Sequence, residues 1–215
     1  MSSERRCALF IGAHPDDIEL GCGGTIARCA RSGVDITCAI LTNGRNPGRT
    51  PEQSVEQAIT GLTMLGVKSI CMPLFPGNSL KQNGKTVGFL IDTLETVNPK
   101  SVFVHAAKDT YHQDHVAAHA ITMAACRKSI RNVFCYESVF NYADAEMIPN
   151  GYVSITPDDL EMKCNALRSY TSEYKKFGGE KWIETVVALA RMRGFKLGCE
   201  YAEAFEIKIC EMTTT

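Results

Sequence analysis

The stretch Cys7-Ala-Leu-Phe-Ile-Gly-Ala-His-Pro-Asp-Asp-Ile-Glu-Leu-Gly-Cys-Gly-Gly-Thr25 decides the fold. Its first seven residues carry no charged side chain, and Cys7–Gly12 is predicted to be a buried strand that leads into His14. In open α/β sheets the ligand crevice lies at the carboxyl ends of the strands. His14 and Asp17 lie three residues apart in a tight turn there, close enough to share one ion, and Asp16 should point elsewhere. This arrangement favours two metal ligands and a separate base.

Two other interpretations of this stretch stay open. In the first, Asp16 or Asp17 caps the following helix and His14 only packs against the protein. In the second, the glycines between positions 21 and 24 belong to a dinucleotide-binding fingerprint. That fingerprint should follow the strand immediately, whereas two carboxylates that would repel a pyrophosphate intervene here. We expect these glycines instead to let the chain approach the sheet closely.

Strand-like and helix-like segments alternate along the chain, which predicts an α/β fold with a mostly parallel sheet and helices on both faces. The expected strands are Cys7–Gly12, Asp35–Leu41, Val67–Met72, Ser101–His105, Val133–Tyr136 and Ala204–Ile209. The expected helices are Ile26–Arg31 after a glycine-rich turn, Pro51–Leu65 with Thr50 as its cap, Val87–Val97, His115–Lys128, Asp158–Tyr170 and Lys181–Met192. The segment Asn141–Pro157 is expected to be irregular, and no linker divides residues 1–215 into more than one domain.

Histidine is concentrated in one part of the chain, since four of the five histidines lie between positions 105 and 119. This segment opens a helix at the same sheet edge as His14. Two histidines and one carboxylate, with a fourth position left to water, are typical of a catalytic zinc site. Such a site also needs a nearby base and an oxyanion stabiliser, and the two clusters contain candidates for both. His119 is a weaker ligand candidate, and His105 is expected to pack or to line the pocket.

The composition argues against several classes of partner. The chain has 215 residues and a formal net charge of −1, so nothing global favours nucleic acid or an anionic membrane surface. Its apolar runs are far shorter than the roughly 20 residues that a bilayer span needs. The ten cysteines include no C-x-x-C pair, so we expect buried free thiols in a cytoplasmic protein.

The stretch Ala13–Thr25, together with Asp109-Thr-Tyr-His-Gln-Asp-His115, resembles the motifs of the LmbE/PIG-L family of zinc-dependent N-acetylglucosaminyl deacetylases. Lys163–Tyr170 and Tyr201–Phe205 also resemble segments of that family, so the resemblance covers nearly the whole chain. It implies a Rossmann-like α/β domain with zinc at the strand ends. It also implies a homo-oligomeric hydrolase that removes the acetyl group from an N-acetylated amino sugar or a glucosaminide conjugate.

Carried over position by position, the resemblance implies roles for six side chains. The implied zinc ligands are His14, Asp17 and His115. Asp16 would be the general base. His112 would stabilise the oxyanion or protonate the leaving amine, and Asp114 would orient or charge-stabilise a histidine.

The chain departs from the family at its predicted second helix. Many members carry an arginine soon after the Pro-Glu that opens this helix, where this chain has Gln53-Ser54. Arg45 or Arg49 in the preceding loop could supply the charge, and Tyr142 could stack on a sugar ring. The hydrophobic span of the family's glycolipid enzymes is missing, which favours a soluble or nucleotide-linked amino sugar as the substrate.

Two other functions fit the same residues. One is a deacylase that acts on a non-sugar amide, and the other is a non-catalytic sugar- or nucleotide-binding module with a structural metal. The ligand types also suit Fe²⁺ or another divalent ion besides Zn²⁺.

Overall fold

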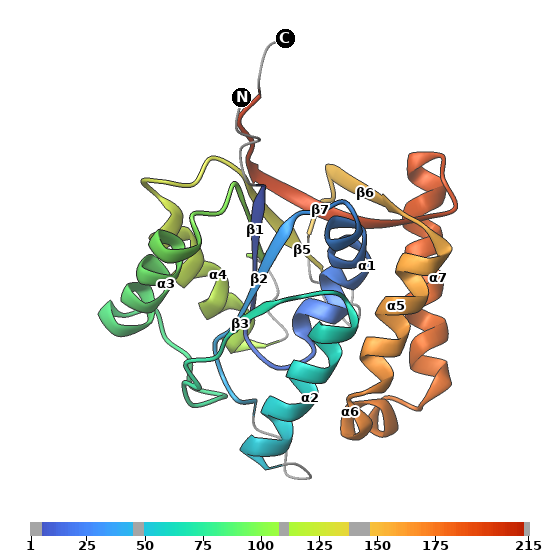
Figure 1. Ribbon diagram of the computed structural model, residues 1–215, viewed down its shortest axis with the longest axis horizontal. Helices are drawn as coiled ribbons and strands as arrows, with labels where there is room; N and C mark the ends of the chain where they lie inside the picture. The colour runs from blue at the N-terminus through green and yellow to red at the C-terminus, as the bar shows by residue number, and fades with distance from the viewer. Residues whose placement is uncertain (1–5, 45–49, 108–111, 138–146, 213–215) are drawn as a thin grey trace.

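A mixed sheet of seven strands forms the centre of the protein (Figure 1). The computed structural model describes residues 6–44, 50–107, 112–137 and 147–212. The strands in these ranges are β1 (Cys7–Gly12), β2 (Asp35–Ile40), β3 (Ser69–Cys71), β4 (Ser101–His105), β5 (Val133–Tyr136), β6 (Gly151–Ile155) and β7 (Tyr201–Ile209). They are ordered β3-β2-β1-β4-β5-β7-β6.

The direction of the chain across the sheet reverses between β1 and β4. From β1 the chain moves outward to β2 and β3, and it then returns to β4 on the other side of β1, with all these pairs parallel. Only β7 is antiparallel to its neighbours, β5 and β6. A reversal of this kind opens a crevice outside the carboxyl ends of the two central strands. His14 follows β1 and His105 ends β4, so both lie at this crevice.

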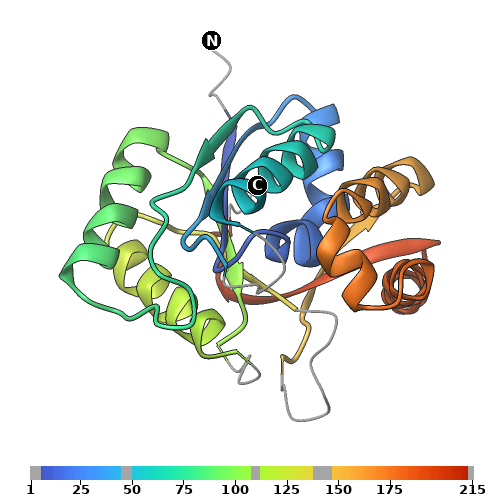
Figure 2. The same cartoon turned by 90° about the horizontal axis from the view of Figure 1, so that it is seen from below.

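Helices cover both faces of the sheet, as Figures 1 and 2 show from two directions. They are α1 (Asp17–Arg31), α2 (Pro51–Met64), α3 (Gly84–Val97), α4 (Gln113–Cys126), α5 (Pro157–Arg168), α6 (Thr171–Lys176) and α7 (Glu180–Leu197). The pair α3 and α4 covers one face and the pair α1 and α2 the other, while α5 and α7 pack beside α1 against β6 and β7. Among the described residues, no helix combines the length and the apolar character that crossing a membrane requires.

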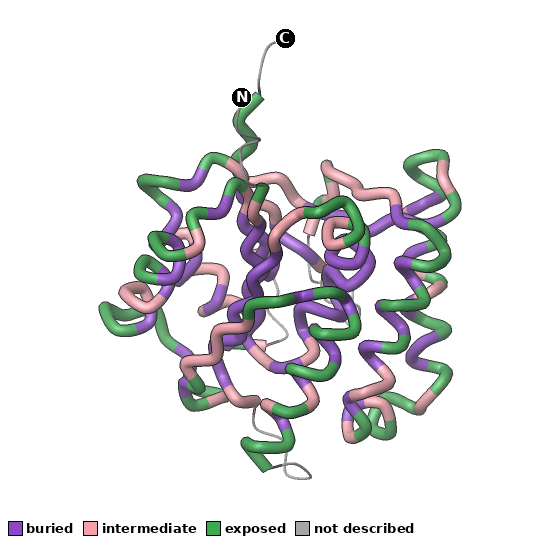
Figure 3. Tube along the Cα trace, in the orientation of Figure 1, coloured by how far each residue is buried: buried purple, intermediate pink, exposed green. Residues whose placement is uncertain are grey.

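Strand β1 is buried on both faces, as the purple centre of Figure 3 shows. Leu9 and Ile11 belong to the core under α3 and α4, whereas Ala8 and Phe10 belong to the core under α1 and α2. A strand covered on both sides reads as a continuous apolar run, which is why the sequence predicts it well. The predicted α/β fold with a mostly parallel sheet is confirmed.

The glycine-rich stretch corrects the sequence prediction, because it lies inside helix α1 and not in a turn before it. A Cβ atom on Gly21 would lie 2.2 Å from Cδ2 of Tyr136, and one on Gly24 would lie 2.6 Å from Cδ1 of Ile155. These glycines therefore let α1 approach β5 and β6 closely, as expected, at the cost of helix propensity.

Other boundaries also differ from the prediction. The segment expected to be irregular contains β6, an edge strand, and α6 was not predicted. The last strand begins at Tyr201, three residues before the predicted start. The predicted cap of α2 is confirmed, since the Thr50 hydroxyl accepts from the Gln53 N–H and Pro51 follows it.

The prediction of buried free thiols is confirmed for five of the ten cysteines, whereas four are only partly buried and Cys210 is exposed. The five buried ones are Cys22, Cys38, Cys126, Cys135 and Cys164. Burial raises the pKa of the Cys126 and Cys135 thiols to about 12. These side chains therefore act as small apolar groups and not as nucleophiles.

Alanine at two helical glycines should change stability in opposite directions. Gly21→Ala places a methyl group against the buried Tyr136 ring, whose hydroxyl donates to the Ile11 carbonyl at 2.8 Å. We expect it to lower the free energy of unfolding by about 1–3 kcal/mol. Gly88→Ala, in α3 with no atom within 4 Å of the added Cβ, should raise it by about 0.5–1 kcal/mol. Urea unfolding measures both, and a Gly21→Ala variant as stable as the parent contradicts the close approach.

Candidate metal centre

The turn after β1 places His14 and Asp17 side by side. The backbone N–H of His14 donates to Oδ2 of Asp17 at 2.7 Å, which closes the turn. Asp17 is the first residue of α1, where the backbone N–H groups and the helix dipole favour a carboxylate. The first predicted pair therefore meets at the crevice between β1 and β4.

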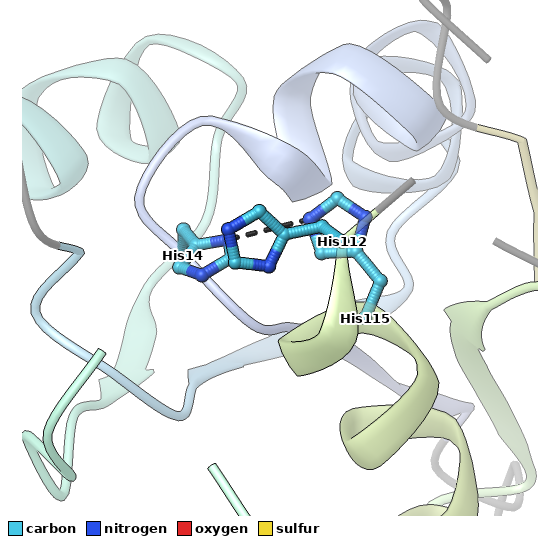
Figure 4. Close-up of side chains that lie close together, drawn as sticks. All are labelled: His14, His112 and His115. Carbon is cyan, nitrogen blue, oxygen red and sulfur yellow. Dashed lines mark hydrogen bonds between the residues drawn. The ribbon is translucent and has the colours of Figure 1, made fainter. Parts of the chain in front are cut away.

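His115 reaches the same point from helix α4. It lies in the first turn of α4, whose N-terminus is capped by His112: Nδ1 of His112 accepts the N–H of Asp114 at 3.2 Å. Figure 4 shows the imidazoles of His14, His112 and His115 gathered beside the start of α4. Residues about 100 positions apart in the sequence thus lie in one cluster.

The spacing of the ligand atoms fits a small divalent cation. Nδ1 of His14 lies 3.3 Å from Oδ2 of Asp17, and Nε2 of His115 lies 3.3 Å from Oδ1 of Asp17. Nε2 of His115 is also 3.3 Å from Nδ1 of His14. A tetrahedral zinc ion with bonds of about 2.0–2.1 Å holds its ligand atoms about 3.3–3.4 Å apart. Different oxygens of Asp17 face the two imidazoles, so the three predicted ligand side chains lie in mutual contact, close enough to share one small cation.

Two trios among the described residues bring one ligand atom from each member within 4.8 Å of one another, and neither trio is the predicted set. The first consists of His14, His112 and His115, and the second of Asp17, His105 and His115. His115 belongs to both trios and to the predicted set, so it is common to all three arrangements. His119 belongs to neither: its Nδ1 lies 2.8 Å from the His105 carbonyl oxygen and 3.6 Å from Sγ of Cys135.

Asp114 lies behind His14 and is fully buried. Its Oδ2 is 3.1 Å from Nε2 of His14, and it accepts the backbone N–H groups of Asn78 at 2.6 Å and Leu80 at 3.0 Å. Burial alone would raise the pKa of Asp114, but these hydrogen bonds lower it. An ionised carboxylate that accepts Nε2–H of His14 leaves Nδ1 of that ring facing Asp17 and His115.

The acidic neighbours of His14 also act on its basicity. Burial lowers the pKa of His14, but the carboxylates of Asp17 and Asp114 outweigh it and raise the pKa to about 9. The same negative charge that draws a proton to this imidazole also attracts a cation, so proton and cation compete for one position.

Two adjacent carboxylates at the site have opposite pKa shifts. Burial raises the pKa of Asp16 well above its usual range, and the charges of Asp17 and Glu173 add to that effect. Burial has the same sign at Asp17, but the charges of His115 and His105 outweigh it and hold the pKa well below the usual range. Asp17 is thus suited to remain an ionised ligand, and Asp16 is the more basic of the pair.

His112 is held in one tautomer. Its Nδ1 accepts the backbone N–H of Asp114, so the neutral ring carries its proton on Nε2. Burial lowers the pKa of His112, and the positive charges of His14 and His115 lower it further. A neutral imidazole with one N–H that is not used by α4 can serve as a hydrogen-bond donor to a ligand.

Several of these contacts could not be predicted from the sequence. The backbone donors of Asn78 and Leu80 to Asp114 leave no side-chain signal, and the charge of Glu173 comes from α6, which the sequence did not predict. His105 was expected to pack or to line the pocket, and it packs on His115 with ring centroids 4.0 Å apart. The substrate candidates lie outside the described residues; they are Arg45, Arg49 and Tyr142.

Known proteins similar to this chain include deacetylases. An uncharacterised deacetylase of Escherichia coli K12, YaiS, is 28% identical over 176 residues, which cover 80% of this chain and 94% of that protein. Diacetylchitobiose deacetylase of Thermococcus kodakarensis is 26% identical over 215 residues, which cover 91% of this chain and 80% of that protein.

One solved structure with a similar fold belongs to an enzyme with a different activity. The 4-carboxy-2-hydroxymuconate hydratase of Pseudomonas putida KT2440 matches with a TM-score of 0.85 over 98% of this chain and 99% of its own. Its sequence identity is only 21%, so this likeness concerns the fold alone.

The family model described as PIG-L, GlcNAc-PI de-N-acetylase, matches residues 9–126, more than half of the chain. The matched interval contains the whole cluster of histidines and carboxylates at the crevice between β1 and β4. The chain therefore belongs to the PIG-L/LmbE family of de-N-acetylases.

Proposed function

We propose that the protein is a metal-dependent N-deacetylase that hydrolyses the acetamide of an N-acetylated amino sugar or glucosaminide conjugate, releasing acetate and a free amine. The observation that carries this proposal is the close approach of His14, Asp17 and His115: the two imidazole nitrogens lie 3.3 Å apart, and each lies 3.3 Å from a different oxygen of Asp17. The family membership and the similar diacetylchitobiose deacetylase support the substrate class.

We propose Zn²⁺ as the cation, with Fe²⁺ as the alternative, held by those three side chains. A bound cation of this kind polarises a carbonyl group and lowers the pKa of water. Asp114 orients the site by accepting the Nε2–H of His14, so that Nδ1 of the same ring faces the other two ligands.

Asp16 carries the proton transfers in this proposal, and His112 stabilises the developing charge. Asp16 accepts a proton from the attacking water as its oxygen bonds to the acetyl carbon, and it passes that proton to the leaving nitrogen. The Nε2–H of neutral His112 donates a hydrogen bond to the carbonyl oxygen as negative charge develops on it. The carbon–nitrogen bond then breaks, and the products are acetate and the amine.

The remaining features of the proposal concern the whole chain. Residues 1–215 form one catalytic domain, and Arg45, Arg49 and Tyr142 contact the sugar or its substituent. The buried free thiols support a reducing cytoplasmic compartment. The protein is further proposed to be a homo-oligomer.

Acetate release tests the function directly. The purified chain should release acetate from at least one of N-acetylglucosamine, diacetylchitobiose, N-acetylhexosamine nucleotide diphosphates, and inositol or malate glucosaminides. A chelator should abolish this activity because the three ligands then hold no cation, and added Zn²⁺ or Fe²⁺ should restore it. Full activity after complete removal of transition metal contradicts the proposal. Release of acyl groups only from non-sugar amides favours the broader deacylase, and metal binding without any hydrolysis favours a binding module.

Asp16→Asn should separate catalysis from metal binding. The backbone of Asp16 has a φ of 98°, in the left-handed region that asparagine also adopts, so the variant should keep the fold. We expect metal content as in the parent and a turnover number lower by about 10²–10⁴-fold, because asparagine accepts no proton. His115→Ala is the matched comparison and should lose the metal. If Asp16→Asn loses the metal instead, Asp16 is a ligand and its proposed role is wrong.

A further inference from the structure

A cavity of about 350 Å³ lies between helix α2 and the segment that leads from α5 into α6. Its size is within the range of pockets that bind small molecules. The start of α2 and the whole of α6 lie at the end of the sheet where β1 finishes (Figure 1). The cavity is therefore at the same end of the molecule as the metal centre.

The α6 side of the cavity is tied to the turn that carries the metal centre. The hydroxyl of Tyr170, which directly precedes α6, donates to Oε1 of Glu19 in the first turn of α1. That helix begins with Asp17, a proposed metal ligand. Glu173 of α6 is also close enough to Asp16 for its charge to raise the pKa of that carboxyl. A group attached to a sugar at the metal centre can therefore extend toward the cavity.

The face of α2 that lines the cavity is polar. It consists of Gln53, Glu56, Gln57 and Thr60, which are spaced so that they share one side of the helix. A helix face turned toward a neighbouring helix is usually apolar, because such a face is buried by packing. This face instead presents amide and hydroxyl groups to an open space.

The amide groups of this face are oriented by the protein. Oε1 of Gln53 accepts the backbone N–H of Thr50 at 2.9 Å, which leaves its N–H groups for other partners. Nε2 of Gln57 donates to Oγ1 of Thr171 at 3.2 Å, so α2 and α6 are joined across the cavity. The donors and acceptors of both walls are thus held in place before any ligand arrives.

Ser172 contributes a hydroxyl group that the fold does not satisfy. It lines the cavity, and its oxygen is buried without a hydrogen-bond partner among the residues that the structure describes. A buried hydroxyl in this state destabilises the folded protein. Rotation about its Cα–Cβ bond turns the group toward the cavity, where a ligand hydroxyl can pair with it.

The charge of the lining argues against an anionic ligand. None of the described residues that line the cavity is a lysine or an arginine, and the one ionisable side chain among them is the carboxylate of Glu56. Proteins bind phosphate and carboxylate groups mainly with arginine and lysine. Amides and hydroxyls, in contrast, match the mixed donors and acceptors of an uncharged sugar ring.

We propose that this cavity is a subsite for an uncharged, hydroxyl-rich ring linked to the N-acetylated sugar, so that the substrate is a neutral oligosaccharide or glycoside and not a nucleotide diphosphate conjugate. The inference rests on the proposed function, because it assigns a second subsite for the same reaction. Its effect is on how tightly the substrate binds, and the residues of the cavity take no part in the proton transfers.

Steady-state kinetics of acetate release by the metal-loaded protein tests the subsite. The substrates are N-acetylglucosamine, diacetylchitobiose and uridine diphosphate N-acetylglucosamine. We expect a KM for diacetylchitobiose about 10-fold or more below that for N-acetylglucosamine, because the second ring gains hydrogen bonds in the cavity. The nucleotide conjugate should have the lowest kcat/KM of the three. A kcat/KM for the nucleotide conjugate equal to or above that for diacetylchitobiose overturns the inference.

Thr60→Phe fills the cavity with a ring and should raise KM for diacetylchitobiose toward that for N-acetylglucosamine, with little change in kcat. Thr63→Phe is the matched control, since Thr63 is an exposed residue of the same helix that does not line the cavity. It should keep the parent's KM. An equal rise of KM in both variants assigns the effect to the altered helix and overturns the subsite.

Ser172→Ala distinguishes binding from a structural role. Loss of a hydroxyl without a partner should leave the unfolding temperature equal to or above that of the parent. Loss of its hydrogen bond to the ligand should raise KM for diacetylchitobiose about 3–10-fold at the same time. Because this variant should fold even if Thr60→Phe does not, it keeps the test decisive. The parent's KM in either variant overturns the inference.

The outcome also separates the subsite from the function on which it rests. If the parent releases acetate from these sugars without any preference for diacetylchitobiose, the subsite fails and the deacetylase proposal stands. If the parent releases acetate from no N-acetylated sugar, both are overturned.

Discussion

The carboxylate of Asp17 is the interaction on which the site depends. Its Oδ2 meets the His14 N–H at 2.7 Å and His105 at 3.0 Å, and its Oδ1 meets His115 at 3.3 Å. One charged group thereby joins the turn after β1, the end of β4 and the first turn of α4. Because Asp17 also begins α1, the helix dipole stabilises its charge. The reversal of strand order between β1 and β4 provides the space in which these three segments meet.

The neighbouring Asp16 shows how two adjacent carboxylates acquire different chemistry. A left-handed φ of 98°, which Asp16 adopts, costs a non-glycine residue about 1–2 kcal/mol. Asp17 gains three imidazole neighbours and a low pKa, whereas Asp16 remains near the carboxylates of Glu173 and Glu19 with a raised pKa. These opposite pKa shifts suit the proposed division of the two residues into a ligand and a base.

The sequence predicted the features that depend on local pattern. The continuous apolar runs gave the boundaries of β1, β4 and β5, and the short acidic turn predicted that His14 and Asp17 lie side by side. The sequence-based prediction failed where tertiary contacts override helix propensity, as in α1. The glycines of α1 are tolerated inside the helix because Tyr136 and other side chains fill the space that a Cβ would take. The support of Asp114 by backbone N–H groups and the stacking of His105 on His115 depend on loops and strands far apart in the sequence, so no local pattern records them.

The C-terminal segments that resemble the family are explained by their contacts with α1. Glu203 of β7 accepts the backbone N–H groups of Gly24 at 3.0 Å and Thr25 at 2.7 Å, and it pairs with buried Lys163 of α5 at 2.6 Å. A buried carboxylate needs such partners, and loss of either charge would leave the other uncompensated. The contact therefore ties β7 and α5 to the middle of the helix whose first residue is Asp17. The family-matched interval carries all the proposed ligands, but the turn that presents two of them is supported by residues beyond it.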